Sequence, residues 1–290
     1  MRIDTPLLAG PCPAAPPAGP VTVVRNIRQI HHRLAAAPDL RPGEPVDGLF
    51  RRLVHLVVTT PPALAHAVLA DPDVRALRTS LVELCARGEY ELERAWARHV
   101  AASPVPPFAL ARFPYLGNYG QLAQLEHDAV GRHGGGRPVR RALFVGAGPL
   151  PLSSLLLARW LGVVVDNLDN DPTAVDAARA VASGIGARDL AFRHDELAAC
   201  DDLSAYDLVV LAALVGLTPE QKRHHLRHLL QIMAPGALLL ARSAHGLRTL
   251  LYPAIDLADL GGWDVLAVTH PTGPVINSVI LARKPCGGSR

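Results

Sequence analysis

The chain has 290 residues, of which 49% are hydrophobic and 19% are charged, and its formal net charge is only +3. This length is sufficient for one large hydrophobic core or two smaller ones. The lysines and arginines are scattered and aromatic residues make up 4% of the chain, so we expect no nucleic-acid partner.

The cysteines and the apolar segments indicate the compartment. Cys12, Cys85, Cys200 and Cys286 lie far apart and form no CxxC pair, and the N-terminus lacks the charged and apolar pattern of a signal peptide. The apolar run 208–217 is too short to cross a bilayer and is better interpreted as a buried strand with its exit loop. These features predict a protein with reduced cysteines in the cytoplasm and no membrane partner.

The N-terminal half has a helical pattern. Residues 6–20 form a Pro/Ala/Gly tract, so we expect residues 1–20 to be an extended arm. From residue 21 to residue 135 the periodicity is helical, in VDGLFRRLVHLVV, PPALAHAVLA and DVRALRTSLVELCARGEYELERAWARHV, with a proline-rich break at SPVPPFALARFP. This part is predicted to be an all-helical domain.

The pattern changes after the segment GRHGGGRPVR, residues 131–140, whose glycines, basic residues and proline are typical of a linker. Residues 136–290 alternate short strand-like runs with helices: RALFVGAG, LGVVVDNLD, AFRHDE, YDLVVLAAL, GALLLARSA, GWDVLAVTH and NSVILARK. This alternation predicts parallel βαβ units in a Rossmann-like, doubly wound α/β sheet. Ligands of such sheets bind beyond the carboxyl ends of the strands.

A glycine-rich turn follows the first predicted strand. In GAGPLP, Gly146, Ala147 and Gly148 are followed by Pro149 and Pro151. The glycines permit a tight turn and a close approach of the backbone to a ligand, and the prolines suit the first turn of a helix. The third glycine of a dinucleotide fingerprint is absent, which argues against a bound pyrophosphate.

An acidic residue follows the second predicted strand. Asp169 lies 21 positions beyond Gly148, near the roughly 20-residue offset at which a carboxylate accepts from ribose hydroxyls. The turn and this carboxylate together fit a nucleoside without a phosphate. The alternative for Asp169 and Asp171 is capping of the helix that begins at Pro172, and for Asp171 capping is the better interpretation.

Two further loops complete the predicted nucleoside site. Asp195, after the third strand-like run, is placed to accept from an adenine amino group. The loop from Ala212 to Gly216, which includes Leu214, is expected to line the other face of the nucleoside. Together these features predict S-adenosylmethionine as a co-substrate.

A carboxylate lies on the apolar face of the long predicted helix. Glu89 falls on the stripe formed at helical spacing by Leu81, Val82, Cys85, Leu92 and Trp96. A buried carboxylate is costly unless it is paired or used chemically, and burial raises its pKa toward that of a general base. Glu93 is four residues further on and can converge on the same pocket. The alternative for Glu89 is a buried structural salt bridge.

The next segment, FPYLGNYGQLAQLEHDAV, carries a second polar element inside an apolar face. Tyr115, Tyr119, Leu122 and Glu126 are separated by helical steps. Buried tyrosine hydroxyls need hydrogen-bond partners, and a tyrosine beside a carboxylate can relay a proton. The alternative is a core tyrosine whose hydroxyl is satisfied by a structural partner.

These residues lie in segments that resemble those of a known protein family. The chain resembles the nicotianamine synthase family, including its shorter bacterial relatives that make opine-type metallophores of the staphylopine and pseudopaline kind. The matching segments extend from about Asp47 to Lys284: LVELC with the following glutamates, FPYLGNY, FVGAGPLPLSS, YDLVVLAALVG, MAPGALLLARSAHGLRTLLYP and HPTGPVINSVILARK. Several of these are long and unusual, which makes the resemblance specific.

The resemblance implies aminobutyrate (3-amino-3-carboxypropyl) transfer from S-adenosylmethionine to an amine, with release of methylthioadenosine. In the family pattern Glu89 and Tyr115 are the deprotonating pair, and Glu93, Asn118 and Tyr119 shape the acceptor pocket. The residues expected to hold the nucleoside are Gly146, Ala147, Gly148, Pro149, Asp169, Asp195, Ala212 and Leu214. Arg242 is predicted to bind a substrate carboxylate through its guanidinium group.

Several alternatives remain open at this stage. Plant members commonly have two adjacent tyrosines after the Phe-Pro pair, whereas here Leu116 follows Tyr115, so either Tyr115 or Tyr119 can be the proton relay. The chain length favours a single transfer to an amino acid such as histidine, followed by an opine dehydrogenase, over condensation of several S-adenosylmethionine molecules. A conventional methyltransferase and a non-catalytic binding protein are the other hypotheses. A homodimer is a hypothesis that no visible sequence patch supports.

The segment KRHHLRH places His224 and His228 at a spacing that could ligate a metal. The chemistry requires no metal, and no carboxylate or cysteine lies at matching spacing. A solvated basic face is therefore the preferred interpretation, and no metal is predicted.

Overall fold

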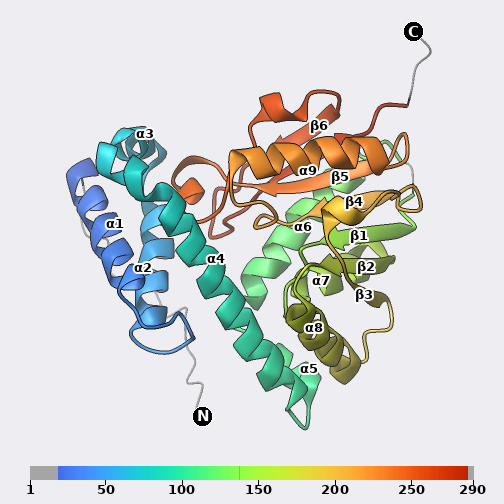
Figure 1. The fold of residues 1–290 in the computed structure, drawn as a ribbon, viewed down its shortest axis with the longest axis horizontal. Coiled ribbons are helices and arrows are strands. Elements are labelled where there is room, and N and C mark those ends of the chain that lie inside the picture. Colours follow the sequence, from blue (N-terminus) through green and yellow to red (C-terminus); the bar gives the residue numbers. More distant parts are fainter. Residues whose placement is uncertain (1–18, 137, 287–290) are drawn as a thin grey trace.

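The computed structural model describes residues 19–136 and 138–286 (Figure 1). The predicted proline-rich arm lies outside the described residues up to residue 18, and Pro20 already begins the first helix. The helices before the sheet are α1 (Pro20–Ala35), α2 (Val46–Thr59), α3 (Pro62–Ala70), α4 (Pro72–Ala101), α5 (Pro106–Leu110) and α6 (Leu116–His133). The predicted helical pattern of this half is confirmed, and the proline-rich break contains the short helix α5.

Helix α4 runs diagonally between the other N-terminal helices and the sheet (Figure 1). Its start is fixed by Asp71, whose carboxylate accepts hydrogen bonds from the N–H groups of Asp73 and Val74 at 2.9 and 3.2 Å. Pro72 occupies the first helical turn, where its missing N–H is not needed. The buried face of α4 packs on α1 and α3 on one side and on α8 on the other, so α4 joins the two halves of the chain.

The second half forms a seven-stranded sheet in the order β3-β2-β1-β4-β5-β7-β6. The strands are β1 (Arg141–Val145), β2 (Val164–Asp169), β3 (Leu190–His194), β4 (Leu208–Leu211), β5 (Leu238–Ser243), β6 (Asp264–Thr269) and β7 (Ser278–Arg283). The main connecting helices are α7 (Leu152–Leu161), α8 (Pro172–Ile185) and α9 (Pro219–Ile232). The predicted Rossmann-like α/β class is confirmed.

The sheet is mixed rather than wholly parallel. Strands β1 to β5 pair in parallel, but β7 is antiparallel to both β5 and β6. The expectation of parallel units throughout was wrong at this edge. Residues 270–277 join β6 to β7 without a helix, and a short connection returns the chain in the antiparallel direction.

Helix α6 packs on the sheet, although the sequence grouped it with the N-terminal helices. Its residues Leu122, Ala129 and Val130 share a buried cluster with Phe144 of β1 and Val210 of β4, and Figure 1 shows the helix alongside the strands. The predicted linker, residues 131–140, follows this helix. The change of periodicity therefore marks the start of the sheet, while one helix before it belongs to the sheet's packing.

A shared core fixes the position of α4 against the second half. Trp96 and Val100 of α4 pack with Phe113, with Leu150 beyond the glycine turn and with Val181 of α8. Burial of such apolar side chains is the main favourable contribution to packing. Side chains on the adjacent turns of α4 are consequently held over the carboxyl ends of β1 and β2.

No single described helix is long and apolar enough to span a bilayer, and one pair, α2 with α3, meets the length and composition test only when joined across a 117° bend.

Candidate active site

The glycine turn adopts a backbone conformation that requires glycine. Gly146 and Gly148 have φ values of +81° and +67°, which other residues rarely adopt. A Cβ at Gly146 would lie 2.3 Å from the Val215 side chain, and one at Gly148 would lie 2.6 Å from Oε2 of Glu93. Helix α7 begins only at Leu152, so the prolines precede the first helical turn instead of occupying it.

Asp169 lies at the end of β2 and is bound to this turn. Its Oδ2 accepts a hydrogen bond from the Gly148 N–H at 2.8 Å, and its Oδ1 accepts from the Asp171 N–H at 3.0 Å. A carboxylate has about four acceptor positions, so Asp169 can also accept from a ligand. Asp171 caps α8 by accepting from the Thr173 N–H at 2.8 Å, and the capping interpretation is confirmed.

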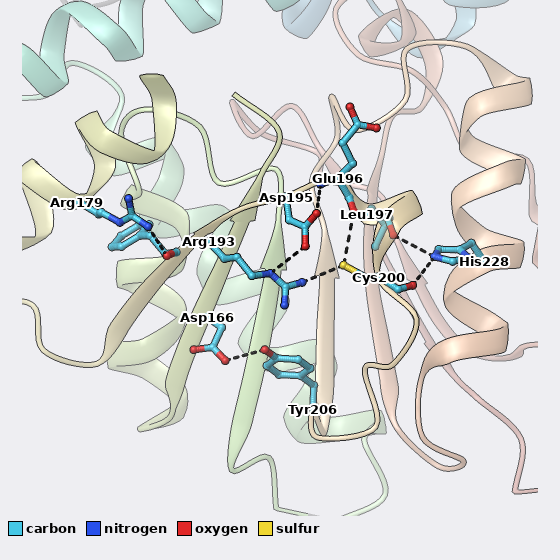
Figure 2. A network of polar contacts seen from close by, with 10 residues as sticks. Asp166, Arg179, Arg193, Asp195, Glu196, Leu197, Cys200, Tyr206 and His228 are labelled. Atoms are coloured by element: carbon cyan, nitrogen blue, oxygen red, sulfur yellow. Dashed lines mark hydrogen bonds and ion pairs between the residues drawn. The ribbon is translucent and has the colours of Figure 1, made fainter. Parts of the chain in front are cut away.

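Asp195 lies just beyond β3 in the polar network of Figure 2. Its carboxylate accepts from the Glu196 N–H at 2.9 Å and lies 3.6 Å from Nε of Arg193. The Arg193 guanidinium also donates to the Cys200 thiol sulfur at 2.9 Å. The Asp195 side chain is 38% exposed. It is therefore held by these contacts and is still accessible to a ligand. Its contact with adenine stays a prediction.

A cavity of about 1050 Å³ lies where α4 crosses these strand ends. The sequence-predicted residues that line it are Glu89, Glu93, Asn118, Tyr119, Gly146, Ala147, Gly148, Pro149, Asp169, Asp195, Ala212, Leu214 and Arg242. Tyr115 lines instead an adjacent cavity of about 220 Å³, which shares Glu89, Glu93, Asn118 and Tyr119 with the larger one. The fold therefore brings distant sequence motifs to two adjoining spaces.

Two carboxylates and two tyrosines meet at the boundary of these cavities. Glu89 accepts hydrogen bonds from the hydroxyls of Tyr252 at 2.5 Å and Tyr119 at 3.4 Å. The Tyr119 hydroxyl also lies 2.8 Å from Oε1 of Glu93. Among the described residues, the hydroxyls that hydrogen-bond to Glu89 are those of Tyr119 and Tyr252. This geometry is compatible with Tyr119 as the proton relay, and the pairing of Glu89 with Tyr115 stays a prediction. Tyr115 directly precedes α6, one turn before Tyr119, and lines the smaller cavity.

The protonation of this group follows from its burial. Burial raises the pKa of Glu89, although the hydrogen bond from Tyr252 opposes the shift. Burial and then the negative charge of Glu89 raise the pKa of Glu93 well above its ordinary value. A tyrosine has one hydroxyl hydrogen, so Tyr119 donates to one carboxyl and can accept from the other only when that one is protonated. The geometry fits a proton shared along Glu93, Tyr119 and Glu89.

Arg242 does not present a free guanidinium to the cavity. Its Nε and Nη2 donate to the two carboxylate oxygens of Glu126 at 2.6 and 3.1 Å, and its Nη1 donates to the Ser153 hydroxyl at 3.0 Å. Both Arg242 and Glu126 are buried. In this structure the guanidinium binds a carboxylate of the protein, while Arg242 also lines the larger cavity. Its predicted contact with a substrate carboxylate stays a prediction.

Asn118 connects α6 to the loop between β6 and β7. Its Nδ2 donates to the carbonyl of Pro274 at 2.8 Å, and the side chain still lines both cavities. One amide hydrogen and the amide oxygen remain for a ligand. Its predicted place in the acceptor pocket is compatible with this geometry and stays a prediction.

The segment KRHHLRH is not a uniformly solvated face. Lys222 is completely buried, and His228 Nε2 lies 3.0 Å from the carbonyl oxygens of both Leu197 and Cys200 (Figure 2). The predicted solvated face is correct for His224, which is exposed at the rim of the larger cavity, but not for Lys222. Within the part of the chain that the structure describes, no group of three or more His, Cys, Asp or Glu side chains is arranged to bind a metal.

Two cavity residues were not identified from the sequence. Tyr252 follows a short 3-10 helix after β5 and reaches Glu89 across 163 positions of sequence. Tyr90 of α4 donates to the Asp171 carboxylate and lines the larger cavity. Tyr252 lies in the segment RTLLYP, residues 248–253, but periodicity alone does not indicate such long-range contacts.

The fold and this site define an α/β protein of the S-adenosylmethionine-dependent methyltransferase-like class, with a helical part that supplies acidic residues to the ligand cavity. Comparison with known proteins narrows the class. The family described as nicotianamine synthase protein matches residues 18–288, and the chain belongs to the nicotianamine synthase family.

Relatives and solved structures agree with this assignment. The chain is 44% identical over 271 residues to nicotianamine synthase 2 of Oryza sativa subsp. japonica, covering 90% of this chain and 82% of the rice protein. It is 37% identical over 273 residues to nicotianamine synthase 2 of Arabidopsis thaliana, covering 92% and 85%. The structure of a mutant of MtNAS in complex with S-adenosylmethionine matches with a TM-score of 0.78 and 25% identity, covering 90% of this chain and 98% of that one.

Proposed function

We propose that this protein transfers the aminobutyrate group of S-adenosylmethionine to the amine of an amino-acid-type acceptor and releases methylthioadenosine. The observation that carries the proposal is the placement of Glu93 and Glu89 beside the glycine turn. Oε2 of Glu93 lies 2.6 Å from the position of a Cβ at Gly148. Acidic side chains from α4 thus meet the backbone turn on which a nucleoside would rest. MtNAS structures contain S-adenosylmethionine in one case and MTA with tNA in another.

The reaction requires a neutral amine at the γ-carbon of the methionine chain. A new C–N bond forms there while the C–S bond breaks, and the electron pair of that bond remains on sulfur, which converts the sulfonium into a neutral thioether. The amine must lose a proton before or during attack. Glu89 is the proposed acceptor, because it combines a raised pKa with hydroxyl groups of Tyr119 and Tyr252 that stabilise it when charged.

The nucleoside would occupy the larger cavity. Gly146, Ala147, Gly148 and Pro149 provide the backbone turn, Asp169 faces the ribose, and Asp195 faces the adenine amino group. Ala212 and Leu214 cover the opposite face. Positioning the sulfonium against this turn leaves the methionine chain directed toward Glu89 and Glu93, which aligns the γ-carbon with the acceptor rather than the methyl group.

The acceptor would enter from the smaller cavity. Its wall includes Asp47 and Arg51 of α2 together with Tyr115. Asp47 offers a carboxylate for an ammonium group, and Arg51, whose Nη2 donates to Glu44, has further N–H groups for a substrate carboxylate. Its volume of about 220 Å³ favours a single amino acid. This observation supports an amino acid as the acceptor. Within that class we propose histidine, in an opine-type metallophore pathway in which an opine dehydrogenase would act on the product.

Condensation of several S-adenosylmethionine molecules is the second candidate. It is favoured by the 37–44% identity to proteins named nicotianamine synthases in Arabidopsis and rice. In that case the α-amine of a second S-adenosylmethionine takes the place of the amino-acid acceptor, and the product remains in the joined cavities for a further transfer.

Product analysis distinguishes these candidates. The purified protein is incubated with S-adenosylmethionine alone, with L-histidine or with D-histidine, and the nucleoside product is identified by mass spectrometry. Methylthioadenosine that forms only with a histidine enantiomer supports the single transfer. Methylthioadenosine without added acceptor supports the condensation. Adenosylhomocysteine as the product, or no turnover in any arm, would contradict aminobutyrate transfer.

The compartment and the assembly are also proposals. The free thiols of Cys85, Cys200 and Cys286 support a reducing compartment, and a cytoplasmic location is testable by fractionation. A homodimer is testable by analytical ultracentrifugation of the purified protein.

A further inference from the structure

The first turn of α9 contains a buried lysine that the proposed chemistry does not use. Thr218 and Gln221 cap the helix reciprocally, with the Thr218 hydroxyl accepting from the Gln221 N–H at 3.3 Å. Lys222 follows directly and is 0% exposed. No carboxylate pairs with it in the described part of the chain, and burial alone lowers the pKa of Lys222 to about 7. A buried amine of this kind is costly and calls for an explanation.

The partners of Lys222 are backbone carbonyls of one loop. Its Nζ donates to the carbonyl of Ala213 at 2.7 Å and lies 3.4 Å from the carbonyl of Ala212. The Ala212 carbonyl also accepts from the Val215 N–H at 3.2 Å. These carbonyls lie where the chain leaves β4 and can no longer pair within the sheet. The Ala213 carbonyl, which has no other hydrogen-bond donor among the described residues, is satisfied by the amine.

The other face of this loop forms a wall of the large cavity. Residues 212–217 all line it, whereas Lys222 lies behind them. The Val215 side chain occupies the space above Gly146, at 2.3 Å from where a Cβ would be. Gly216, with φ of +76°, lies close to α9, since a Cβ there would be 3.1 Å from Gln221 Cβ and from His225 Cδ2. The loop is thus fitted between the glycine turn and α9.

We propose that Lys222 is a positioning residue for the nucleoside, acting through the loop 212–217 and the contact of Val215 with the glycine turn. This inference rests on the proposed binding of S-adenosylmethionine in the large cavity. A methionine at this position would match the volume of the lysine stem but leave the carbonyl of Ala213 without a donor. The loop would then move away from the turn, and the wall that faces the nucleoside would lose its shape. The reacting carboxylates on α4 would be unaffected.

The test is Lys222→Met, with binding of S-adenosylmethionine and of methylthioadenosine measured by titration calorimetry well below the unfolding temperature. We expect both dissociation constants to rise about tenfold, as for the loss of one to two buried hydrogen bonds, while kcat at saturating S-adenosylmethionine changes less than about twofold. The matched control is Arg223→Met on the same helix turn. It removes the 2.7 Å ion pair with Asp259, does not touch the loop, and should leave both affinities unchanged.

Lys222→Arg is the second variant, because it retains N–H donors for the same carbonyls. It should bind both nucleosides within about threefold of the wild type. Wild-type affinity in Lys222→Met would overturn the proposal. A loss of affinity in Lys222→Arg at an unchanged unfolding temperature would also overturn it. This second measurement tests the proposal even if the methionine variant does not fold. If the wild-type protein binds neither nucleoside, the proposed function fails first, and the role of Lys222 fails with it.

Discussion

At the residue scale, the site depends on where one face of α4 places two glutamates. Glu89 and Glu93 are four positions apart, so they project from the same side of the helix. Burial makes each of them costly when charged, and the shared hydroxyl of Tyr119 links them. This arrangement is suited to holding one proton and releasing it toward an incoming amine.

Glu89→Gln removes the proposed base but keeps a similar shape. We expect methylthioadenosine release to fall about 100-fold or more, in the range typical of a lost general base, while the affinity for S-adenosylmethionine changes less than about threefold. Product release and calorimetry measure the two quantities. Glu91→Gln on the same helix is the control, because Glu91 pairs with Arg94 away from Tyr119 and Tyr252. Equal turnover in Glu89→Gln and the wild type would exclude Glu89 as the base.

The tyrosines give a pH-dependent prediction. The hydrogen bond from Tyr252 lowers the pKa of Glu89 against the effect of burial, so Tyr252→Phe should raise that pKa further. Glu89 would then become deprotonated only at a higher pH, and the acidic limb of the kcat profile should move to higher pH. Tyr119→Phe should shift the limb in the same direction.

Tyr115→Phe is the matched control for both variants. Its hydroxyl faces the smaller cavity and makes no hydrogen bond to Glu89 among the described residues. We expect the acidic limb of Tyr115→Phe to stay in place. A shift in this variant alone would support the predicted pairing of Glu89 with Tyr115.

At the element scale, the glycine turn and α4 are fitted to each other. Gly148→Ala should weaken binding of S-adenosylmethionine by about tenfold or more, because the new Cβ would meet Glu93 at 2.6 Å and the positive φ disfavours alanine. Gly131→Ala in α6 has open space around its Cβ and should bind normally, with stability equal or higher by up to about 1 kcal/mol. Calorimetry and thermal unfolding check both, and normal binding by Gly148→Ala would contradict this account of the turn.

The attachment of α6 to the sheet gives a stability prediction. Glu126→Gln leaves the buried guanidinium of Arg242 without its bidentate partner, so the free energy of unfolding should fall by about 3 kcal/mol. The double variant Glu126→Leu with Arg242→Met should recover most of this loss, because neither member of the ion pair is left buried without its partner. Asp128→Ala removes the exposed ion pair with Arg132 on the same helix and should change stability by less than about 0.5 kcal/mol. Urea unfolding measures all three, and equal losses for Glu126→Gln and Asp128→Ala would refute the structural role.

At the scale of the whole molecule, stability should depend on pH through Lys222. The folded-state pKa of about 7 is below the unfolded value of 10.5, so between these values the unfolded chain binds more protons than the folded one. The free energy of unfolding therefore gains up to about 1.4 kcal/mol per pH unit from this group as the pH rises from 7 to 10. Other groups contribute equally in wild type and Lys222→Met and cancel in the difference.

Urea unfolding of wild type and Lys222→Met at several pH values measures that difference. The wild type should gain stability relative to the variant with rising pH. A difference that does not change with pH would mean that the folded-state pKa of Lys222 is not lowered.

Much of the fold could be predicted from the sequence because its signals are local. Strand and helix periodicities, the glycines of the turn and the capping of α8 by Asp171 depend on neighbours a few positions away. The direction of β7 and the packing of α6 on the sheet were not predicted, because both depend on which surfaces meet after the chain has collapsed. The helical pattern of α6 is the same whether it packs on helices or on strands.

The site also combines features that the local sequence determines with features that only tertiary packing determines. The sequence by itself determined the nucleoside-type turn, the carboxylates Glu89 and Glu93 on one helical face, and the resemblance to the nicotianamine synthase family. Only the tertiary structure decided that Tyr252 and Tyr119 contact Glu89, that Arg242 is paired with Glu126, and that Lys222 is buried behind the cavity loop. Residue type and spacing limit what a side chain can do, but its partner is set by long-range packing, which brings together positions more than a hundred residues apart.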